Sequence, residues 1–290
     1  MAFLDIAGPL LRRDEAGNHL ILGVAATHVA EVATYEFHRG WIALDPEPVA
    51  AALWTPPRHL LLGEPSRESA VRPLAQAIAA DAPALPGLTG NLPAADHFVR
   101  TWTELTGRTA RTISRLANYA LEEVREVPRA PGAPRPANRG DRNLVVAWMR
   151  DFASEAPPQD EIVGAELERF LAGRLEAPDA GYRLWIDESR RPVCLAGFMG
   201  PTGSGIRVGP VYTPPEHRGR GYARSLLAEL ARELFGLGYR ACYLASDLEN
   251  VAANRLYEAV GYRRVGEAEM VSFEDPTEPG SGAGLRAGPG

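Results

Sequence analysis

The sequence predicts a mixed α/β protein in which helices flank a central sheet. Three features of the 290-residue chain predict this class. Short β-branched and apolar runs, typical of strands, alternate with segments whose apolar residues recur at helical spacing. Clusters of proline and glycine separate these segments. A hydrophobic content of 45% and a charged content of 23% are those of a chain that buries a substantial core.

The length favours two domains. Pro128–Pro136 has four prolines in nine residues and is the best candidate linker. We therefore expect an N-terminal domain at 1–127, a linker at 128–136 and a second domain at 137–274. Residues 275–290 are rich in proline, glycine and acidic residues, and we expect them to be disordered.

The first domain alternates strands and helices. Its predicted elements are a helix at Asn18–Val32 capped by Asn18, strands at Trp41–Leu44, Val49–Trp54 and His59–Leu62, a helix at Glu68–Ala80, a loop at Pro83–Gly90, a helix at Ala94–Leu105 and a strand at Ile113–Val127.

The second domain begins with two helices and continues with strands. Its predicted elements are a helix after Asp141, a helix around Val163–Leu171, a hairpin of Tyr182–Ile186 and Val193–Met199, a strand at Ile206–Thr213, a helix from Tyr222, a strand at Ala241–Ser246, a helix after Asn250, and strands at Tyr262–Val265 and Met270–Phe273.

A glycine-rich turn joins the strand Ile206–Thr213 to the helix that begins at Tyr222. Its sequence is Arg218-Gly219-Arg220-Gly221-Tyr222-Ala223. Two residues without a Cβ let a ligand approach the backbone closely, and the first N–H groups of a helix have no intrahelical partner. These open N–H groups and the positive end of the helix dipole favour an anion such as a pyrophosphate.

This turn resembles the Arg/Gln-x-x-Gly-x-Gly/Ala signature of the GCN5-related N-acetyltransferases. The later segment Asn250-Val-Ala-Ala-Asn254-Arg-Leu-Tyr257-Glu-Ala-Val-Gly261-Tyr262 resembles the family's second signature, Asn-x-x-Ala-x-x-Leu-Tyr-x-x-x-Gly-Phe/Tyr. The resemblance implies the acyl-CoA N-acyltransferase fold with a mixed, mostly antiparallel sheet. The order of elements in residues 1–127 also resembles such a fold without its glycine turn, which implies a tandem with a degenerate N-terminal half. An unrelated α+β cap is the alternative for that half.

The resemblance also implies how acetyl-CoA is held as co-substrate. The amides of Gly219–Arg224 would bind the pyrophosphate, and main-chain groups of Val211, Tyr212 and Thr213 would pair with the pantetheine arm. The side chains of Arg218 and Arg224 would add contacts to phosphate. Asn250 and Asn254 would contact the coenzyme or cap the helix. The turn residues assigned to the coenzyme site are Arg218, Gly219, Arg220, Gly221, Tyr222, Ala223 and Arg224.

A dinucleotide site is the rival interpretation. Gly219-Arg220-Gly221 opens like Gly-x-Gly-x-x-Gly, and Asp247 follows about 25 residues later, where a ribose-binding acid would lie. Arg224 stands at the third glycine position, which argues against that site. A P-loop is excluded because no Gly-Lys-Ser/Thr follows.

Tyr257 is the candidate acid, because it stands where the family keeps the tyrosine that protonates the departing thiolate. A phenol, with a pKa of about 10, is protonated at neutral pH. The motif does not single out a general base. Several relatives have a glutamate five residues before the asparagine, whereas this chain has Ala245. Asp247 is our first choice; Glu249, Glu216, His217 and a water relay stay open.

We therefore predict an enzyme that acetylates a primary amine from acetyl-CoA by direct attack in a ternary complex, without a metal. A non-catalytic coenzyme-A sensor or interaction protein on the same fold is the alternative. The acceptor is expected to be a small-molecule or peptide amine, and a homodimer is left open. The net charge of −6 argues against nucleic-acid binding. No apolar run reaches the roughly 18 residues of a membrane span, so we expect a cytoplasmic protein.

Overall fold

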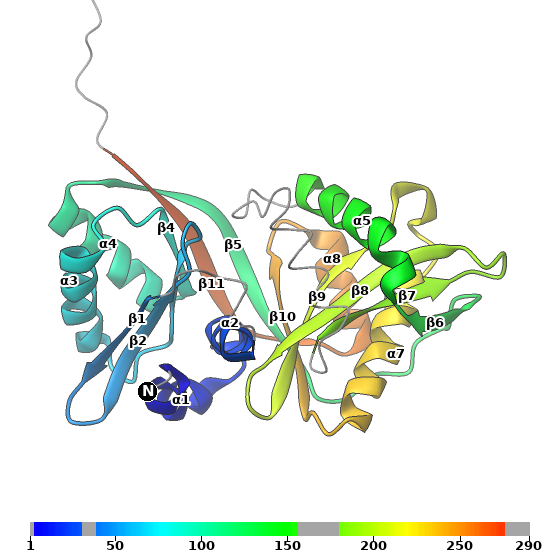
Figure 1. Ribbon diagram of the computed structural model, residues 1–290, viewed down its shortest axis with the longest axis horizontal. Helices are drawn as coiled ribbons and strands as arrows, with labels where there is room; N and C mark the ends of the chain where they lie inside the picture. The colour runs from blue at the N-terminus through cyan, green and yellow to red at the C-terminus, as the bar shows by residue number, and fades with distance from the viewer. Residues whose placement is uncertain (1–2, 31–38, 156–179, 276–290) are drawn as a thin grey trace, which may run out of the picture.

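One continuous sheet runs through the whole molecule. The computed structural model describes residues 3–30, 39–155 and 180–275. Within them, 11 strands lie in the order β1-β2-β3-β4-β11-β5-β10-β9-β8-β7-β6, with helices packed on the sheet (Figure 1). Among the described strands, pairing is antiparallel except between β3 and β4 and between β9 and β10. The predicted class, a mostly antiparallel mixed sheet flanked by helices, is confirmed.

Residues 3–121 form the N-terminal half. Its elements are α1 (Phe3–Leu11), α2 (His19–Ala30), β1 (Arg39–Leu44), β2 (Pro48–Trp54), β3 (Leu60–Leu62), α3 (Val71–Asp81), β4 (Gly87–Asn91), α4 (Ala94–Thr106) and β5 (Thr109–Leu121).

Residues 133–274 form the C-terminal half. Its described elements are β6 (Ala133–Pro136), α5 (Arg142–Glu155), β7 (Gly181–Ile186), β8 (Pro192–Pro201), β9 (Gly205–Tyr212), α7 (Tyr222–Gly236), β10 (Ala241–Asp247), α8 (Val251–Val260) and β11 (Arg263–Glu274). The helix predicted around residues 163–171 lies outside the described residues.

The two halves repeat one arrangement. In each, a strand leads through a helix into a neighbouring parallel strand, as β3–α3–β4 and as β9–α7–β10. A further helix and a long strand then end each half, α4 with β5 and α8 with β11. This repetition confirms the predicted tandem layout.

The halves exchange their last strands. β11, the end of the C-terminal half, lies between β4 and β5 of the N-terminal half. β5, the end of the N-terminal half, lies between β11 and β10 of the C-terminal half. The pairing of β5 with β11 extends from Arg263 opposite Ala120 to Glu274 opposite Thr109. Each half therefore completes its sheet with a strand from the other.

Four elements differ from the sequence prediction: β4, β11, α1 and β6, the last of which lies in the predicted linker. The predicted loop Pro83–Gly90 contains most of β4, whose glycines are required by crowding: a Cβ on Gly87 would lie 2.2 Å from the carbonyl oxygen of Val271. The two predicted last strands are one strand, β11, with register shifts after Arg264 and Met270. Helix α1 was not predicted.

Asn18 does not cap α2 as predicted. Its buried side chain instead donates to the Leu11 carbonyl at 2.9 Å and accepts from the Glu64 amide at 2.7 Å. It therefore joins the α1–α2 connection to the end of β3.

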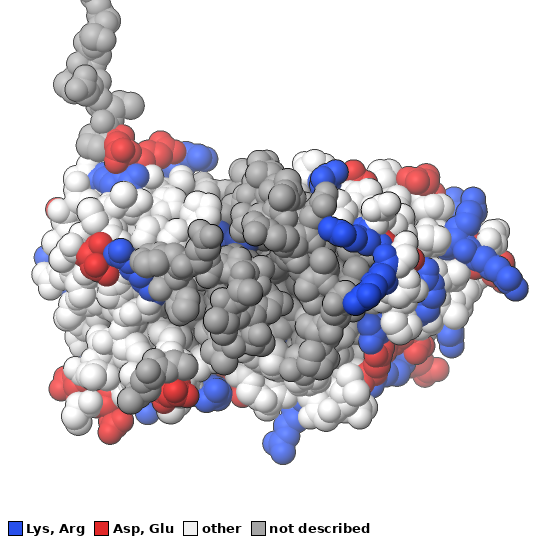
Figure 2. Space-filling view, in the orientation of Figure 1, with Lys and Arg blue, Asp and Glu red and all other residues white. Residues whose placement is uncertain are grey.

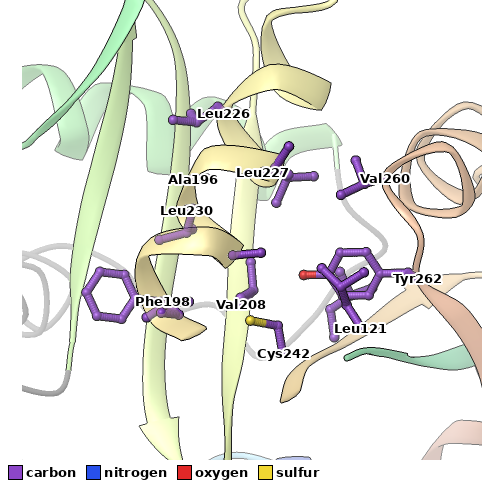
Figure 3. Packing of buried hydrophobic residues seen from close by; sticks show 14 of the residues in the cluster. Leu121, Ala196, Phe198, Val208, Leu226, Leu227, Leu230, Cys242, Val260 and Tyr262 are labelled. Atoms are coloured by element: carbon purple, nitrogen blue, oxygen red, sulfur yellow. The ribbon is translucent and has the colours of Figure 1, made fainter. Parts of the chain in front are cut away.

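Helices α7 and α8 cover the sheet of the C-terminal half. The α7 leucines Leu226, Leu227 and Leu230 are at most 1% exposed and pack against Phe198 and Val208 of the sheet (Figure 3). Burying each of these leucines contributes roughly 1.5–3 kcal/mol. This packing fixes the start of α7, and with it the glycine turn.

The proline-rich segment after β5 is packed on the C-terminal half. The Ala130 amide donates to Ser225 Oγ at 2.8 Å, and Trp185 Nε1 donates to the Pro131 carbonyl at 2.8 Å. The last four residues of the predicted linker form β6 at the edge of the sheet. Proline is tolerated at an edge because its missing N–H removes no ladder bond there.

The connection between α1 and α2 and the body of α2 hold the two halves together. The Glu15 carboxylate accepts hydrogen bonds from Thr202, Ser204 and Gly205 in the β8–β9 turn. Further along, α2 approaches β8 backbone to backbone: a Cβ on Gly200 would lie 2.7 Å from the carbonyl oxygen of Gly23. Gly200 also has φ +66°, which an L side chain adopts with strain.

Gly200→Ala should therefore destabilise the protein. We expect the free energy of unfolding to fall by roughly 1–3 kcal/mol, from backbone strain and the clash with α2. Gly266→Ala is the matched control, because nothing lies within 4 Å of its Cβ position. Its effect should stay within about 0.5 kcal/mol. Urea unfolding followed by tryptophan fluorescence measures both, and equal stability of the two variants would refute the close contact.

Candidate functional site

A bulge in β9 opens the sheet. β9 pairs with β10 only from Gly205 to Arg207. Two β9 residues, Gly209 and Pro210, then stand opposite Gly197 of β8. A bulge of this kind bends its strand, and Pro210 has no N–H to offer a neighbouring strand. Gly197 suits this place because a Cβ would lie 2.8 Å from the Gly209 carbonyl oxygen.

The gap between the separated ends of β9 and β10 is a cavity of about 1110 Å³. This is near the top of the usual range for small-molecule sites, about 300–1,000 Å³. The cavity extends from the glycine turn to α8. Of the residues predicted for the site, those that line it are Val211, Tyr212, Thr213, Arg218, Gly219, Arg220, Gly221, Tyr222, Ala223, Arg224, Asp247, Asn250 and Tyr257. Asn254 is not in the lining.

The glycine turn presents bare backbone to the cavity. Gly219 has φ +74° and Gly221 has φ +79°, and no atom lies within 4 Å of the Cβ position of Gly219. The first helical hydrogen bond after the turn runs from the Ser225 amide to the Gly221 carbonyl at 3.0 Å. The amides of Tyr222–Arg224 consequently have no partner within the helix. The turn is thus an anion cradle of the kind expected from its sequence.

The two arginines flanking the turn differ in their hydrogen-bond partners. Arg218 donates to the Thr213 carbonyl at 2.9 Å and to both carboxylate oxygens of Glu155 at the end of α5. Arg224 places its guanidinium over the turn, with Nη2 3.4 Å from the Cβ position of Gly221. Its Nε is buried and has no hydrogen-bond partner among the described residues. Arg224 is therefore the better placed of the two to meet an anion.

The two asparagines of the second motif hold the start of α8. Asn250 Oδ1 accepts from the Ala253 amide at 3.1 Å and so caps the helix. Asn254 Nδ2 donates to the carbonyls of Asp247 and Leu248, at 3.0 and 3.3 Å, and ties α8 to the end of β10. Asn250 lines the cavity as well as capping the helix, whereas Asn254 acts on the loop that carries Asp247.

Tyr257 projects from α8 into a group of aromatic rings. Its ring lies 5.9 Å from that of Tyr119 and 5.8 Å from that of Tyr262. Burial, with a smaller effect of Tyr119, raises the pKa of Tyr257 to about 12. The phenol is therefore protonated throughout the physiological range and is held as a donor.

The candidate bases divide by position. Asp247, Glu249 and His217 line the cavity, whereas Glu216 does not. Asp247 Oδ2 accepts from Ser114 Oγ at 2.8 Å, and its Oδ1 accepts from the Glu249 amide at 2.7 Å. Each carboxylate oxygen keeps further acceptor capacity.

Asp247 and Tyr257 reach the cavity from opposite faces of the sheet. Asp247 pairs with Leu116 of β5 and shares its face with Ser114. Tyr257 packs against Tyr119, three residues along β5 from Leu116 and hence on the other face. A reaction centre in the gap would lie between a carboxylate and a phenol.

The equivalent position in the N-terminal half is closed. β3 is paired with β4 along its whole length. The amide of Glu64, just beyond β3, is bonded by Asn18. A Cβ on Gly63 would lie 2.3 Å from the side chain of Leu11. The cavity there measures about 30 Å³, room for a single water.

The described residues offer neither a metal site nor a membrane-spanning helix. No three of their His, Cys, Asp and Glu side chains are grouped to hold a metal ion. No described helix is both long and apolar enough to cross a bilayer. Figure 2 shows acidic and arginine side chains interspersed on one face, with arginines gathered over α5 and the adjoining end of the sheet.

Comparisons with known proteins agree with this geometry. Residues 145–262 match the model of the Acetyltransferase (GNAT) family. The GCN5-related N-acetyltransferase from Kribbella flavida superposes with a TM-score of 0.56 at 17% identity, covering 89% of this chain and 96% of that one. A tandem GNAT protein from the clavulanic acid biosynthesis pathway superposes with a TM-score of 0.54 at 14% identity, covering 94% and 96%. At these identities the structures show a shared fold. The search of curated proteins found no match.

Gly221→Asp tests the cradle directly. A carboxylate in the turn should repel the pyrophosphate by charge and occupy the space where the pyrophosphate would approach the backbone. Binding of acetyl-CoA, measured by calorimetry, should therefore be lost. Gly238→Asp is the control, because Gly238 is also a positive-φ glycine with open space around it, at the other end of α7. It should bind like the wild type, with one coenzyme per chain. Equal affinity in both variants, or two coenzymes per chain, would contradict the single cradle.

Proposed function

We propose that the chain transfers an acetyl group from acetyl-CoA to a primary amine, because residues 145–262 match the model of the Acetyltransferase (GNAT) family. The amine nitrogen attacks the thioester carbonyl carbon and forms the C–N bond. The C–S bond breaks, the amine loses a proton to a base, and the thiolate gains one from an acid. The observation that carries the proposal is the single cavity joining the anion cradle, the splayed strands and Tyr257.

The cavity fits coenzyme A along its length. The amides after Gly221 and the Arg224 guanidinium would hold the pyrophosphate. Among the described residues β9 leaves β10 after Arg207, so on the edge away from β8 the backbone of Val211 and Tyr212 is open to the pantetheine arm, whereas the Thr213 carbonyl already accepts from Arg218. The thioester at the end of the pantetheine arm would then lie toward Tyr257 and Asp247.

Direct attack in a ternary complex is favoured over a covalent enzyme intermediate. Both cysteines, Cys194 and Cys242, are fully buried, and neither lines the cavity. Burial raises the pKa of each thiol to about 12, so the nucleophilic thiolate is scarce at neutral pH. The second substrate must therefore attack the thioester itself.

Tyr257 is the proposed acid. Burial raises the pKa of the Tyr257 phenol. The same surroundings would disfavour the charged thiolate of the departing coenzyme and so raise the pKa of its thiol as well, which keeps proton transfer from the phenol to the thiolate feasible. Asp247 is the proposed base, placed on the opposite face at the end of β10. The acceptor would enter from that side, where Leu116 and Phe152 add apolar lining. We propose a small-molecule or peptide amine.

Tyr257→Phe separates an acid from a packing residue. The variant keeps the ring and its contacts but loses the hydroxyl, so turnover should fall by about 10²–10⁴-fold with acetyl-CoA affinity nearly unchanged. The assay follows free thiol released from acetyl-CoA across a panel of amines. Tyr262→Phe is the control: its buried hydroxyl has no partner among the described residues, and it lies outside the cavity lining.

The control should turn over at close to the wild-type rate. If the Tyr257→Phe variant keeps most of the wild-type turnover rate, Tyr257 is not the acid. Acetyl-CoA binding by the wild type without thiol release from any amine would instead favour a coenzyme-A sensor, the second candidate. That candidate is favoured by one observation, the alanine at position 245, where several relatives have a catalytic glutamate.

A further inference from the structure

β5 is the strand that completes the C-terminal half, although it belongs to the N-terminal half. It runs antiparallel to β10 from Leu121 opposite Cys242 to Leu116 opposite Asp247. The Leu248 amide then donates to the Arg115 carbonyl at 2.9 Å, which continues the contact into the loop before α8. The edge of the cavity therefore lies against a strand from the other half.

On one face, β5 holds the carboxylate of Asp247. Ser114 is buried, and its hydroxyl lies 2.8 Å from Asp247 Oδ2. Because the Glu249 amide holds Oδ1, the carboxylate is fixed at both oxygens. Leu116, two residues along the same face, lines the cavity beside it.

On the other face, β5 supports the ring of Tyr257. Tyr119 is 2% exposed, and its ring meets that of Tyr257 at 5.9 Å with an angle of 51° between their planes. This distance lies within the range of about 4.5–7 Å over which aromatic pairs attract each other. The ring of Tyr262 meets that of Tyr257 edge to face at 5.8 Å, so two neighbouring rings pack against Tyr257.

We propose that the N-terminal half is a working part of the acyl-transfer site, with Ser114 orienting Asp247 and Tyr119 orienting Tyr257. The two are positioning residues: each acts through a residue that would exchange a proton with the substrates. A hydroxyl bonded to the carboxylate restricts its rotation, and a packed ring restricts the phenol. This inference rests on the proposed function of the same cavity.

A double-mutant cycle tests the Ser114 arm. Ser114→Ala should lower kcat by about 10-fold, the order expected for a hydrogen bond to a charged group, while KM for acetyl-CoA stays within about twofold. In an Asp247→Ala background the same change should have little further effect, because the group it positions is gone. Ser114→Thr, which keeps a hydroxyl, should recover much of the rate.

Ser272→Ala is the matched control on β11. Its hydroxyl bonds the Arg111 carbonyl at 3.3 Å, away from the cavity. It should leave kcat unchanged in either background. If Ser114→Ala has no effect on kcat, or costs the same factor with and without Asp247, the positioning role of Ser114 is overturned.

Two substitutions of Tyr119 distinguish the contribution of its ring from that of its hydroxyl. Tyr119→Leu should lower kcat by about 10-fold with KM for acetyl-CoA little changed, and Tyr119→Phe should recover the rate because it restores the ring. Wild-type kcat in Tyr119→Leu would overturn this arm. Should the wild type itself release no thiol with any amine, the proposed function fails and this inference falls with it. An active wild type with unaffected Ser114 and Tyr119 variants overturns the inference alone.

Discussion

The exchange of β5 and β11 is the constraint on which the rest of the structure depends. β11 finds its hydrogen-bond partners in β4 and β5, and β5 finds its partners in β11 and β10. A buried strand cannot leave its N–H and C=O groups unpaired without a large cost, so each half requires the other's last strand. The 11-stranded sheet is the result. It also places β5 beside β10, where the C-terminal cavity begins.

The shared sheet contains two similar strand–helix–strand units, of which the C-terminal one opens to a cavity and the N-terminal one is closed. In the C-terminal unit the bulge at Gly209–Pro210 separates β9 from β10. The glycine turn leaves amides open, and the buried Nε of Arg224 has no partner among the described residues. In the N-terminal unit β3 ends while still paired with β4, and the amides of Gly63 and Glu64 beyond it donate to the Ala51 carbonyl and to Asn18 Oδ1. The connection between α1 and α2, which bonds the Glu64 amide through Asn18, also holds the β8–β9 turn through Glu15. The N-terminal half thus supports the C-terminal half although its own equivalent position is closed.

Local chemistry explains which features the sequence could predict. Gly219 and Gly221 before a helix predict an anion cradle because positive φ and open amides are local properties, and the spacing of Asn250 and Tyr257 places one aromatic residue near it. The opening of the sheet was expected only from the family resemblance, which implied free main-chain groups at Val211–Thr213; its cause, the bulge at Gly209–Pro210 inside an apolar run, was not predicted. β4 was missed because its glycines are typical of loops, whereas Gly87 is required by its contact with the distant β11 and Gly90 lies close to Leu62 of β3. The strand exchange, and with it Ser114 and Tyr119, depends on pairings more than 100 residues apart in the chain, which no local pattern reports.

Native-state hydrogen exchange, read peptide by peptide at increasing urea concentration, tests the central claim most directly. If the halves are joined through exchanged strands, amides of β4, β11, β5 and β10 should lose protection together, in the opening with the highest free energy. The outer strands β1 and β6, which have one paired neighbour each, should exchange earlier. Loss of protection in β4 at urea concentrations that leave β5, β10 and β11 protected would contradict the account, because it would show the halves opening as separate units.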